Sequence, residues 1–342
     1  MPLVGAEAGL GRWLAHVRSL WPKFWLGPLS PLAPLLPFLL FALYQFVRGE
    51  FRVDHVLVIV IAGALAYIGP RTKELLLGLY PFALVWIFYD AMRPLQKVGL
   101  SPARVHLCDL RDLELALFGF EWNGQRATLH DWFYVAHTPT LDLLSAVPYA
   151  TFIIACVATT IYLSFKDKAA MRTFAWSFLV LNVLGFLTYH IIPAAPPWYF
   201  HAHGCEVDLA TRATEGPALA RVDARLGIAF FHGMYGRASS VFGALPSLHC
   251  GYPMLIVVVG WRHFGVLARA ASVGFAVWMV FSAVYLDHHW LIDAALGISY
   301  AIVVATGLGA LERYRARRAA AEPAPPTLAV DRGSSVASGG GR

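Results

Sequence analysis

The sequence is poor in charged residues. Only 14% of its 342 residues are Asp, Glu, Lys or Arg, whereas soluble globular proteins carry roughly a quarter. At the same time 58% of the residues are hydrophobic, and the mean hydropathy is +0.58. This composition excludes an ordinary soluble domain and is typical of a membrane protein. The net charge of +6 does not indicate nucleic-acid binding, because much of it falls in short loops between apolar segments.

Cysteine frameworks and a cleavable signal peptide are also absent. No two of the four cysteines share the spacing of a metal site or of a disulfide framework. Cys156 and Cys250 fall in apolar segments, where we expect them to be packing residues. Cys108 and Cys205 fall in two loops that we place on the same side of the membrane, which leaves one disulfide open. The N-terminus has no short apolar core followed by a small-residue cleavage site, so no cleavable signal is expected.

What the sequence does contain is a series of eight apolar runs. A helix needs roughly 20 apolar residues to cross a bilayer, and these runs approach or reach that length. They are Leu32–Val47, Val56–Ile68, Leu75–Tyr89, Leu143–Phe165, Thr173–Ile192, Leu248–Trp261, Val266–Leu286 and Trp290–Leu311. We therefore predict an all-α polytopic membrane protein with about eight transmembrane helices, of which the second is the shortest.

Basic residues indicate the orientation of these helices. They cluster after every second apolar run, where cytoplasmic loops are expected. They are Arg71, Lys73, Lys166, Lys168, Arg172, Arg262, Arg269, Arg313, Arg315, Arg317 and Arg318. Both termini are then cytoplasmic. The loops at residues 93–142 and 193–246 and the turn at residues 287–289 are extracytoplasmic, in what we expect to be a bacterial plasma membrane.

Two polar clusters then meet on the extracytoplasmic side. His289 and Asp293 are four residues apart at the start of the last run, so a helix places them on one face. The carboxylate can accept from one imidazole nitrogen and leave the other free to attack phosphorus. His249 opens an earlier run after Ser247, and the hydroxyl and free N–H groups at that helix start form an anion site. We expect phosphoryl-type transfer through a phosphohistidine on His289, with His249 protonating the departing oxygen and no metal or cofactor.

Less specific interpretations apply to each cluster taken alone. A histidine at a helix start is often an interfacial residue, and a His/Asp pair four residues apart can be a surface hydrogen bond. Three histidines and an aspartate can also bind a metal. The catalytic interpretation is favoured because both clusters fall on the same side of the membrane, although neither was used to assign the orientation.

The two clusters also resemble a known family. Pro246-Ser-Leu-His249 and His289-x-x-x-Asp293, ending near Gly297, resemble the second and third motifs of the type 2 phosphatidate phosphatase superfamily. The resemblance covers the third to eighth apolar runs, which correspond to the six-helix core of that family. It implies that His289 is the nucleophile, Asp293 its orienting residue and His249 the general acid.

Two departures from the phosphatase pattern point to one branch of the family. An arginine six residues before the nucleophile is replaced by Ala283, and a lysine seven residues before Arg93-Pro94 is replaced by Trp86. Three stretches are instead similar to the inositol phosphorylceramide synthase branch. They are Tyr285–Asp293, Pro193-Ala-Ala-Pro-Pro-Trp-Tyr199 and the run from His137-Thr-Pro-Thr-Leu-Asp142 to Pro148-Tyr149. That resemblance implies phosphatidylinositol as donor, ceramide or a related lipid alcohol as acceptor, and diacylglycerol as by-product.

Other residues are candidates for binding the substrate, since the arginine and lysine of the phosphatase pattern are replaced here. Arg93 and Arg237 are placed to hold phosphate, although an arginine at the interface also snorkels without a ligand. Asp142, His137 and Asp287 are candidates for binding inositol hydroxyls, and His288 is expected to shape the site beside the nucleophile. Each of these residues also has a purely structural interpretation.

The same observations define four regions and two competing functions. We expect an interfacial amphipathic segment at 1–31, two accessory helices at 32–70, a six-helix catalytic domain at 71–314 and a disordered tail at 315–342. A lipid phosphatase with water as acceptor is one alternative, since a transferase must exclude water. A transporter or flippase is the other, but it predicts paired helix breaks or charges near the midplane, and the sequence shows neither. No nucleic acid is expected, and no protein partner can be identified.

Overall fold

The eight predicted apolar runs are all helices. The computed structural model describes residues 3–21, 32–92, 98–236, 238 and 240–321. The apolar helices are α2 (Leu36–Val47), α3 (Val53–Tyr67), α4 (Pro70–Met92), α7 (Pro139–Lys166), α8 (Lys168–Ile191), α12 (Leu248–Gly260), α13 (Val266–Tyr285) and α14 (Leu291–Ala321). In the described part of the chain, α4, α7, α8, α13 and α14 are long and apolar enough to cross a membrane, and the other three are shorter. The protein is an all-α polytopic membrane protein.

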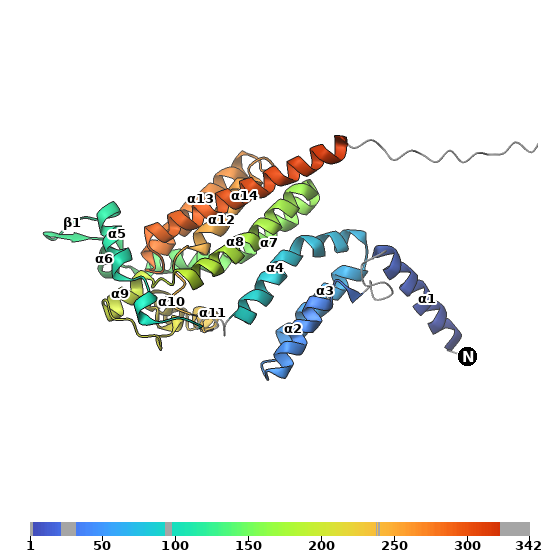
Figure 1. Ribbon diagram of the computed structural model, residues 1–342, viewed down its shortest axis with the longest axis horizontal. Coiled ribbons are helices and arrows are strands. Elements are labelled where there is room, and N and C mark those ends of the chain that lie inside the picture. Colours follow the sequence, from blue (N-terminus) through green and yellow to red (C-terminus); the bar gives the residue numbers. More distant parts are fainter. Residues whose placement is uncertain (1–2, 22–31, 93–97, 237, 239, 322–342) are drawn as a thin grey trace, which may run out of the picture.

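Helices α4, α7, α8, α12, α13 and α14 form one bundle (Figure 1). A core cluster built largely on α7, α8 and α12 joins them, with Phe174, Leu181 and Leu255 fully buried. Asp167 closes the turn between α7 and α8, because its carboxylate accepts from the Ala169 and Ala170 N–H groups at 2.8 and 3.1 Å. This cap keeps the two long helices antiparallel and adjacent.

Helices α12 and α14 approach each other through glycine. A Cβ added to Gly297 on α14 would lie 2.0 Å from the Ser247 carbonyl oxygen, and one added to Gly251 on α12 would lie 3.1 Å from the Gly297 carbonyl oxygen. Only the absence of side chains allows this contact. With 13 residues, α12 is also short. A helix of that length is about 20 Å long, less than the roughly 30 Å of a hydrocarbon core.

One end of the bundle is covered by what we call the loop layer, the described residues 98–136, 193–236, 238 and 240–246 (Figure 1). It contains the short helices α5 (Cys108–Phe118), α6 (Leu129–Ala136), α9 (Pro197–His203), α10 (Pro217–Leu226) and α11 (Phe230–Tyr235). A hairpin of β1 (Phe120–Trp122) and β2 (Gln125–Ala127) and two 3₁₀ turns, Pro102–Arg104 and Ala213–Glu215, complete it. A disulfide joins Cys108 at the start of α5 to Cys205 just after α9, so the pairing that the sequence left open is present.

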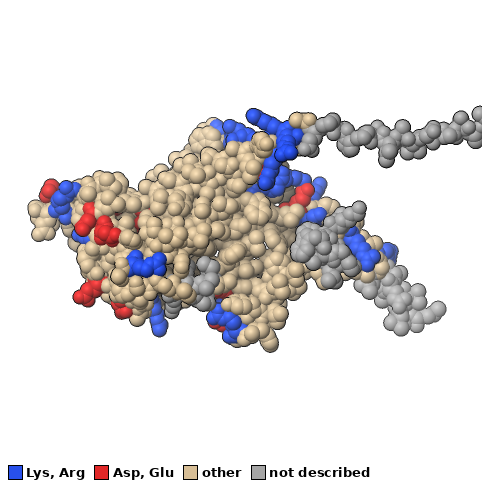
Figure 2. Space-filling model, in the orientation of Figure 1, with Lys and Arg blue, Asp and Glu red and all other residues tan. Residues whose placement is uncertain are grey.

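Charge is distributed unevenly between the two ends of the molecule. Figure 2 shows both acidic and basic residues over the loop layer and mainly Lys and Arg where α14 ends, with an uncharged surface between them. The end of α14 carries the sequence Glu-Arg-Tyr-Arg-Ala-Arg-Arg. The uncharged band has the character of a surface that faces lipid.

The N-terminal helices pack on α4 rather than on the rest of the bundle (Figure 1). Helix α1 (Leu3–Leu20) is attached near its end, where the Trp21 indole N–H donates to the Ala66 carbonyl at 3.1 Å and Lys73 Nζ donates to the Leu20 carbonyl at 2.5 Å. A cluster of Leu20, Trp21, Phe38 and Leu76 joins α1 to α2 and α4. At the other end of the chain α14 continues to Ala321, and the rest of the predicted tail lies outside the described residues.

Candidate active site

The two histidines predicted to meet are in direct contact. His249 lies in the first turn of α12, and His289 lies in the turn that joins α13 to α14. His249 Nδ1 is 3.1 Å from His289 Nε2. The other nitrogen of His289, Nδ1, is 2.9 Å from the Ala244 carbonyl oxygen. Because a carbonyl can only accept, Nδ1 of His289 carries the proton and Nε2 keeps its lone pair toward His249.

Burial keeps His289 in its nucleophilic form. Removal from water lowers the pKa of His289, and the hydrogen bond to the Ala244 carbonyl raises it. The first effect is the larger, so the pKa falls to about 4. Burial, and then the nearby histidines, also lower the pKa of the neighbouring His288, to about 3. Both imidazoles are therefore neutral at pH 7, as a nucleophilic nitrogen requires.

Asp293 is beside His289 but does not orient it as predicted. Its Oδ2 lies 3.6 Å from His289 Nδ1, which is too long for a hydrogen bond. That oxygen instead accepts from the Trp290 N–H at 2.9 Å and caps the first turn of α14. The expected Asp–His hydrogen bond is thus replaced by the Ala244 bond. Asp293 is fully buried, and among the described residues its Oδ1 has no hydrogen-bond partner.

Ser247 is also placed differently from the expectation. Its hydroxyl accepts from the Cys250 N–H at 3.4 Å, so it caps its own helix, α12. The residue is fully buried against Gly297 of α14. The hydroxyl therefore helps to fix the start of α12, whose positive end carries His249.

Two tyrosines that sequence reasoning missed surround the histidines. The centroid of the Tyr149 ring lies 4.7 Å from that of His249 and 5.3 Å from that of His288. The Tyr235 ring is stacked on His288, with 5.2 Å between the centroids. Both hydroxyls are buried and have no hydrogen-bond partner in the described part of the chain. Tyr149 is part of the Pro148-Tyr149 pair in the branch resemblance, but that pair assigned it no role at the site. Tyr235, at the end of α11, belongs to no motif.

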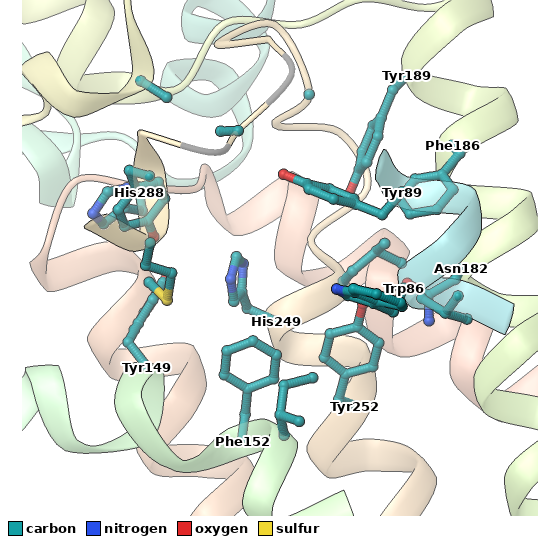
Figure 3. Close-up of a pocket in the computed structure, with 18 of the residues that line it drawn as sticks. Trp86, Tyr89, Tyr149, Phe152, Asn182, Phe186, Tyr189, His249, Tyr252 and His288 are labelled. Atoms are coloured by element: carbon teal, nitrogen blue, oxygen red, sulfur yellow. Dashed lines mark hydrogen bonds between the residues drawn. The ribbon is translucent and has the colours of Figure 1, made fainter. Parts of the chain in front are cut away.

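The histidines line a cavity of about 840 Å³. Figure 3 shows His288 and Tyr149 on one side of His249 and an aromatic group on the other. We call this group, contributed by α4, α7, α8 and α12, the aromatic arm. Its rings are Phe82, Trp86, Tyr89, Phe152, Phe186 and Tyr252. One continuous space therefore connects a polar reaction centre with an apolar region inside the bundle.

Of the remaining predicted site residues, Asp142 does not line this cavity. Asp142 is buried, pairs with Arg221 at 2.9 Å and accepts from the Tyr285 hydroxyl at 3.0 Å. It therefore joins α7 to α10 and α13 rather than lining the cavity. Arg93 and Arg237 lie outside the described residues. Within the described ranges, no group of three or more His, Cys, Asp or Glu side chains is arranged to hold a metal ion.

Comparison with known proteins finds a family and several curated relatives. The family model of the PAP2 superfamily matches residues 115–307, which include both histidines and Asp293. A phosphoinositol dihydroceramide synthase of Bacteroides thetaiotaomicron is 34% identical over 256 residues, covering 74% of this chain and 82% of that protein. An inositol phosphorylceramide synthase of Candida albicans is 29% identical over 251 residues, covering 72% of this chain but 51% of that longer protein. No solved structure matches the chain.

The match of more than half the chain identifies the family, and it includes the contact between His249 and His289. The curated relatives are named as synthases of the inositol phosphorylceramide type rather than as phosphatases. Their names agree with the departures from the phosphatase pattern at Ala283 and Trp86. The chain belongs to the PAP2 superfamily and is a membrane lipid phosphotransferase of its inositol phosphorylceramide synthase-like branch.

Proposed function

We propose that the protein transfers inositol phosphate from phosphatidylinositol to ceramide or a related lipid alcohol, through a phosphohistidine on His289. The observation that carries this proposal is the contact of His249 Nδ1 with His289 Nε2 at 3.1 Å on the wall of a cavity with an apolar arm. The substrates follow from the names of the relatives. Diacylglycerol is the product that leaves first.

The two histidines divide the chemistry of the first step. The donor phosphate enters between the rings and replaces their mutual hydrogen bond. His289 Nε2 attacks phosphorus and the bond from phosphorus to the glycerol oxygen breaks. His249, which enters this step as the imidazolium, gives that oxygen a proton and becomes neutral. In the second step His249 takes the proton of the acceptor hydroxyl, the acceptor oxygen attacks phosphorus, and the bond to His289 breaks. The second step restores both histidines.

The cavity offers separate surroundings for the two parts of a lipid substrate. The unpartnered hydroxyls of Tyr149 and Tyr235 suit the oxygens of a polyol phosphate, since buried polar groups without partners are costly. His288 lies between these tyrosines and shapes the same region. The aromatic arm suits a hydrocarbon chain. Arg93 and Arg237 remain our candidates for the phosphate charge.

We further propose that the site faces the extracytoplasmic side of a bacterial plasma membrane, with both termini in the cytoplasm. Lys and Arg gather at the end of the bundle opposite the loop layer (Figure 2), which the positive-inside tendency places in the cytoplasm. The Bacteroides relative supports a bacterial setting. In this arrangement residues 71–314 form the catalytic domain, and the helices at 32–70 are accessory to it.

The test uses purified protein in detergent with head-group-labelled phosphatidylinositol, with and without ceramide. We expect a new labelled lipid that requires both ceramide and His289, and a loss of about 10⁴-fold or more in His289→Ala. His263→Ala is the matched control, because His263 lies in the turn between α12 and α13, at the end of α12 opposite His249, and does not line the cavity. Release of labelled inositol phosphate or inorganic phosphate irrespective of ceramide would establish a phosphatase instead. No turnover by folded protein would contradict the catalytic assignment.

A further inference from the structure

The turn that carries the nucleophile is held from outside by Asp287. This residue directly precedes His288 and His289, and its φ of +63° is uncommon for a residue with a side chain. Its carboxylate receives one histidine at each oxygen. His130 Nδ1 of α6 is 3.1 Å from Oδ1, and His201 Nδ1 of α9 is 2.5 Å from Oδ2. Asp287 is thus connected to two elements of the loop layer.

His201 connects Asp287 to a second carboxylate. Its other nitrogen, Nε2, lies 3.2 Å from Asp131 Oδ1 of α6. Ionised carboxylates can only accept, so both nitrogens of His201 must donate, and the ring is an imidazolium. Asp131 in turn pairs with Arg111 of α5 at 3.2 Å and accepts from the Thr128 N–H at 2.7 Å. Charges therefore alternate along a row that ends at the catalytic turn.

Ionisation follows from this geometry. Burial lowers the pKa of His201, but the hydrogen bonds and charges of Asp131 and Asp287 outweigh it and raise the pKa to about 9. Burial raises the pKa of Asp131, yet its bonds to His201 and Thr128 and the Arg111 charge lower it to about 2. The other ionisable groups that face this row are Glu114 of α5, His130 and Tyr134 of α6.

Backbone contacts tie the same turn to the same layer. The Asp287 carbonyl accepts from the Trp198 N–H of α9 at 3.0 Å. The Trp290 indole donates to the Ala195 carbonyl at 3.0 Å, and Glu114 accepts from the Leu291 N–H at 3.0 Å. His289 lies in the middle of these anchors. A shift of Asp287 would therefore move His289 Nε2 relative to His249.

We propose that His201, as a cation between Asp287 and Asp131, is a positioning residue that holds His289 in its reactive place, and that loss of its proton slows phosphotransfer at high pH. This proposal rests on the proposed function, because it concerns the rate of that transfer. The sign follows from the raised pKa. The contribution of His201 is complete below its ordinary pKa of about 6.5 and disappears as the pH rises through about 9.

The test compares His201→Gln and His201→Lys with the matched control His203→Gln. His203 lies two residues further along α9 and contacts the Tyr199 ring rather than a carboxylate. Transfer is measured between pH 6 and pH 10 in folded, purified protein. For His201→Gln we expect kcat to fall by about 10- to 100-fold at pH 7, since a displacement of 1 Å can cost about 100-fold. The KM for donor stays near wild type, and the alkaline decrease is lost.

The lysine variant separates charge from packing. Lysine has an ordinary pKa of about 10.4, so His201→Lys is expected to recover part of kcat and to move the alkaline decrease to higher pH. His203→Gln should behave as wild type. If His201→Gln keeps the wild-type rate and the wild-type alkaline decrease, the proposal is wrong.

A second measurement does not depend on the substrate. Amide hydrogen exchange at residues 287–292 should be faster in His201→Gln than in wild type or His203→Gln. It should also be faster in wild type at pH 10 than at pH 7, after correction for the intrinsic rate. Unchanged exchange overturns the positioning role even if the protein acts on other lipids. Absence of transfer by wild type, with faster exchange in His201→Gln, instead contradicts only the proposed function.

Discussion

The contact between His249 and His289 is held by two regions of opposite character. On the bundle side, α12 and α14 meet through glycine backbone and the buried Ser247. On the outer side, the loop layer holds the turn of His289 with carboxylates, histidines and a disulfide. At Gly297 the bundle side has no room for an added carbon atom. In the loop layer, the position of Asp287 depends instead on contacts between charged side chains.

This difference separates two requirements of the reaction. The distance between α12 and α14 limits how far His249 can lie from His289, and close packing of small residues keeps it short. The direction of the His289 ring depends instead on the Ala244 carbonyl and on the turn anchored at Asp287. Variants on the bundle side should therefore abolish the site, and variants in the loop layer should weaken it.

The largest effect is expected at Gly297. In Gly297→Ala the new Cβ would lie 2.0 Å from the Ser247 carbonyl oxygen, a backbone atom that cannot move without shifting the start of α12. We expect transfer to fall by at least about 100-fold and the melting temperature to drop. Gly307→Ala on the same helix is the control, because nothing lies within 4 Å of that position. Equal activity of the two variants would contradict the close contact of α12 and α14.

An intermediate effect is expected at Asp293. Asp293→Asn removes the charge but keeps an oxygen for the Trp290 N–H. Because Ala244 already fixes the His289 tautomer, we expect kcat to fall by about 10- to 100-fold, less than the roughly 10⁴-fold seen when a triad aspartate sets the tautomer. Asp167→Asn, at a helix cap on the other end of the bundle, should leave kcat unchanged. A 10⁴-fold loss would show that Asp293 bonds His289 directly during turnover.

The bundle side was largely predictable from the sequence. The apolar runs and the alternating basic loops determine which helix ends share a side of the membrane. The meeting of His249 and His289 could therefore be predicted from the order of these segments along the chain. Their chemistry could be proposed because few residue types attack phosphorus without a metal. The i,i+4 spacing also placed Asp293 beside His289 correctly.

The hydrogen-bond partners of several site residues could not be predicted, because they are distant in sequence. The Ala244 carbonyl that replaces the Asp293 bond is 45 residues from His289. The partners of Asp287 are 157 and 86 residues away. Asp142 was predicted to bind inositol hydroxyls, but it pairs with Arg221 of α10, which is 79 residues away. No local period or spacing encodes such pairs, because loop conformation, rather than helix geometry, brings them together.

The smallest effect on the reaction itself is expected from the disulfide of the loop layer. It joins α5 to α9, the helix that carries His201, across 97 residues of sequence. In Cys108→Ser/Cys205→Ser we expect the loop layer to lose about 2–4 kcal/mol of stability against unfolding. At low temperature kcat should stay near wild type, because the contacts of Asp287 and the cluster of Tyr199, Trp198 and Phe242 still hold α9.

Activity as a function of temperature distinguishes this expectation from a direct role in catalysis. The double variant should lose activity at a lower temperature than wild type, and a reducing agent should have the same effect on wild type. The free cysteines Cys156 and Cys250 are buried, so the reducing agent acts on the one disulfide of the described chain. A large loss of kcat at low temperature would mean that the loop layer, like the α12–α14 contact, fixes the distance between the two histidines.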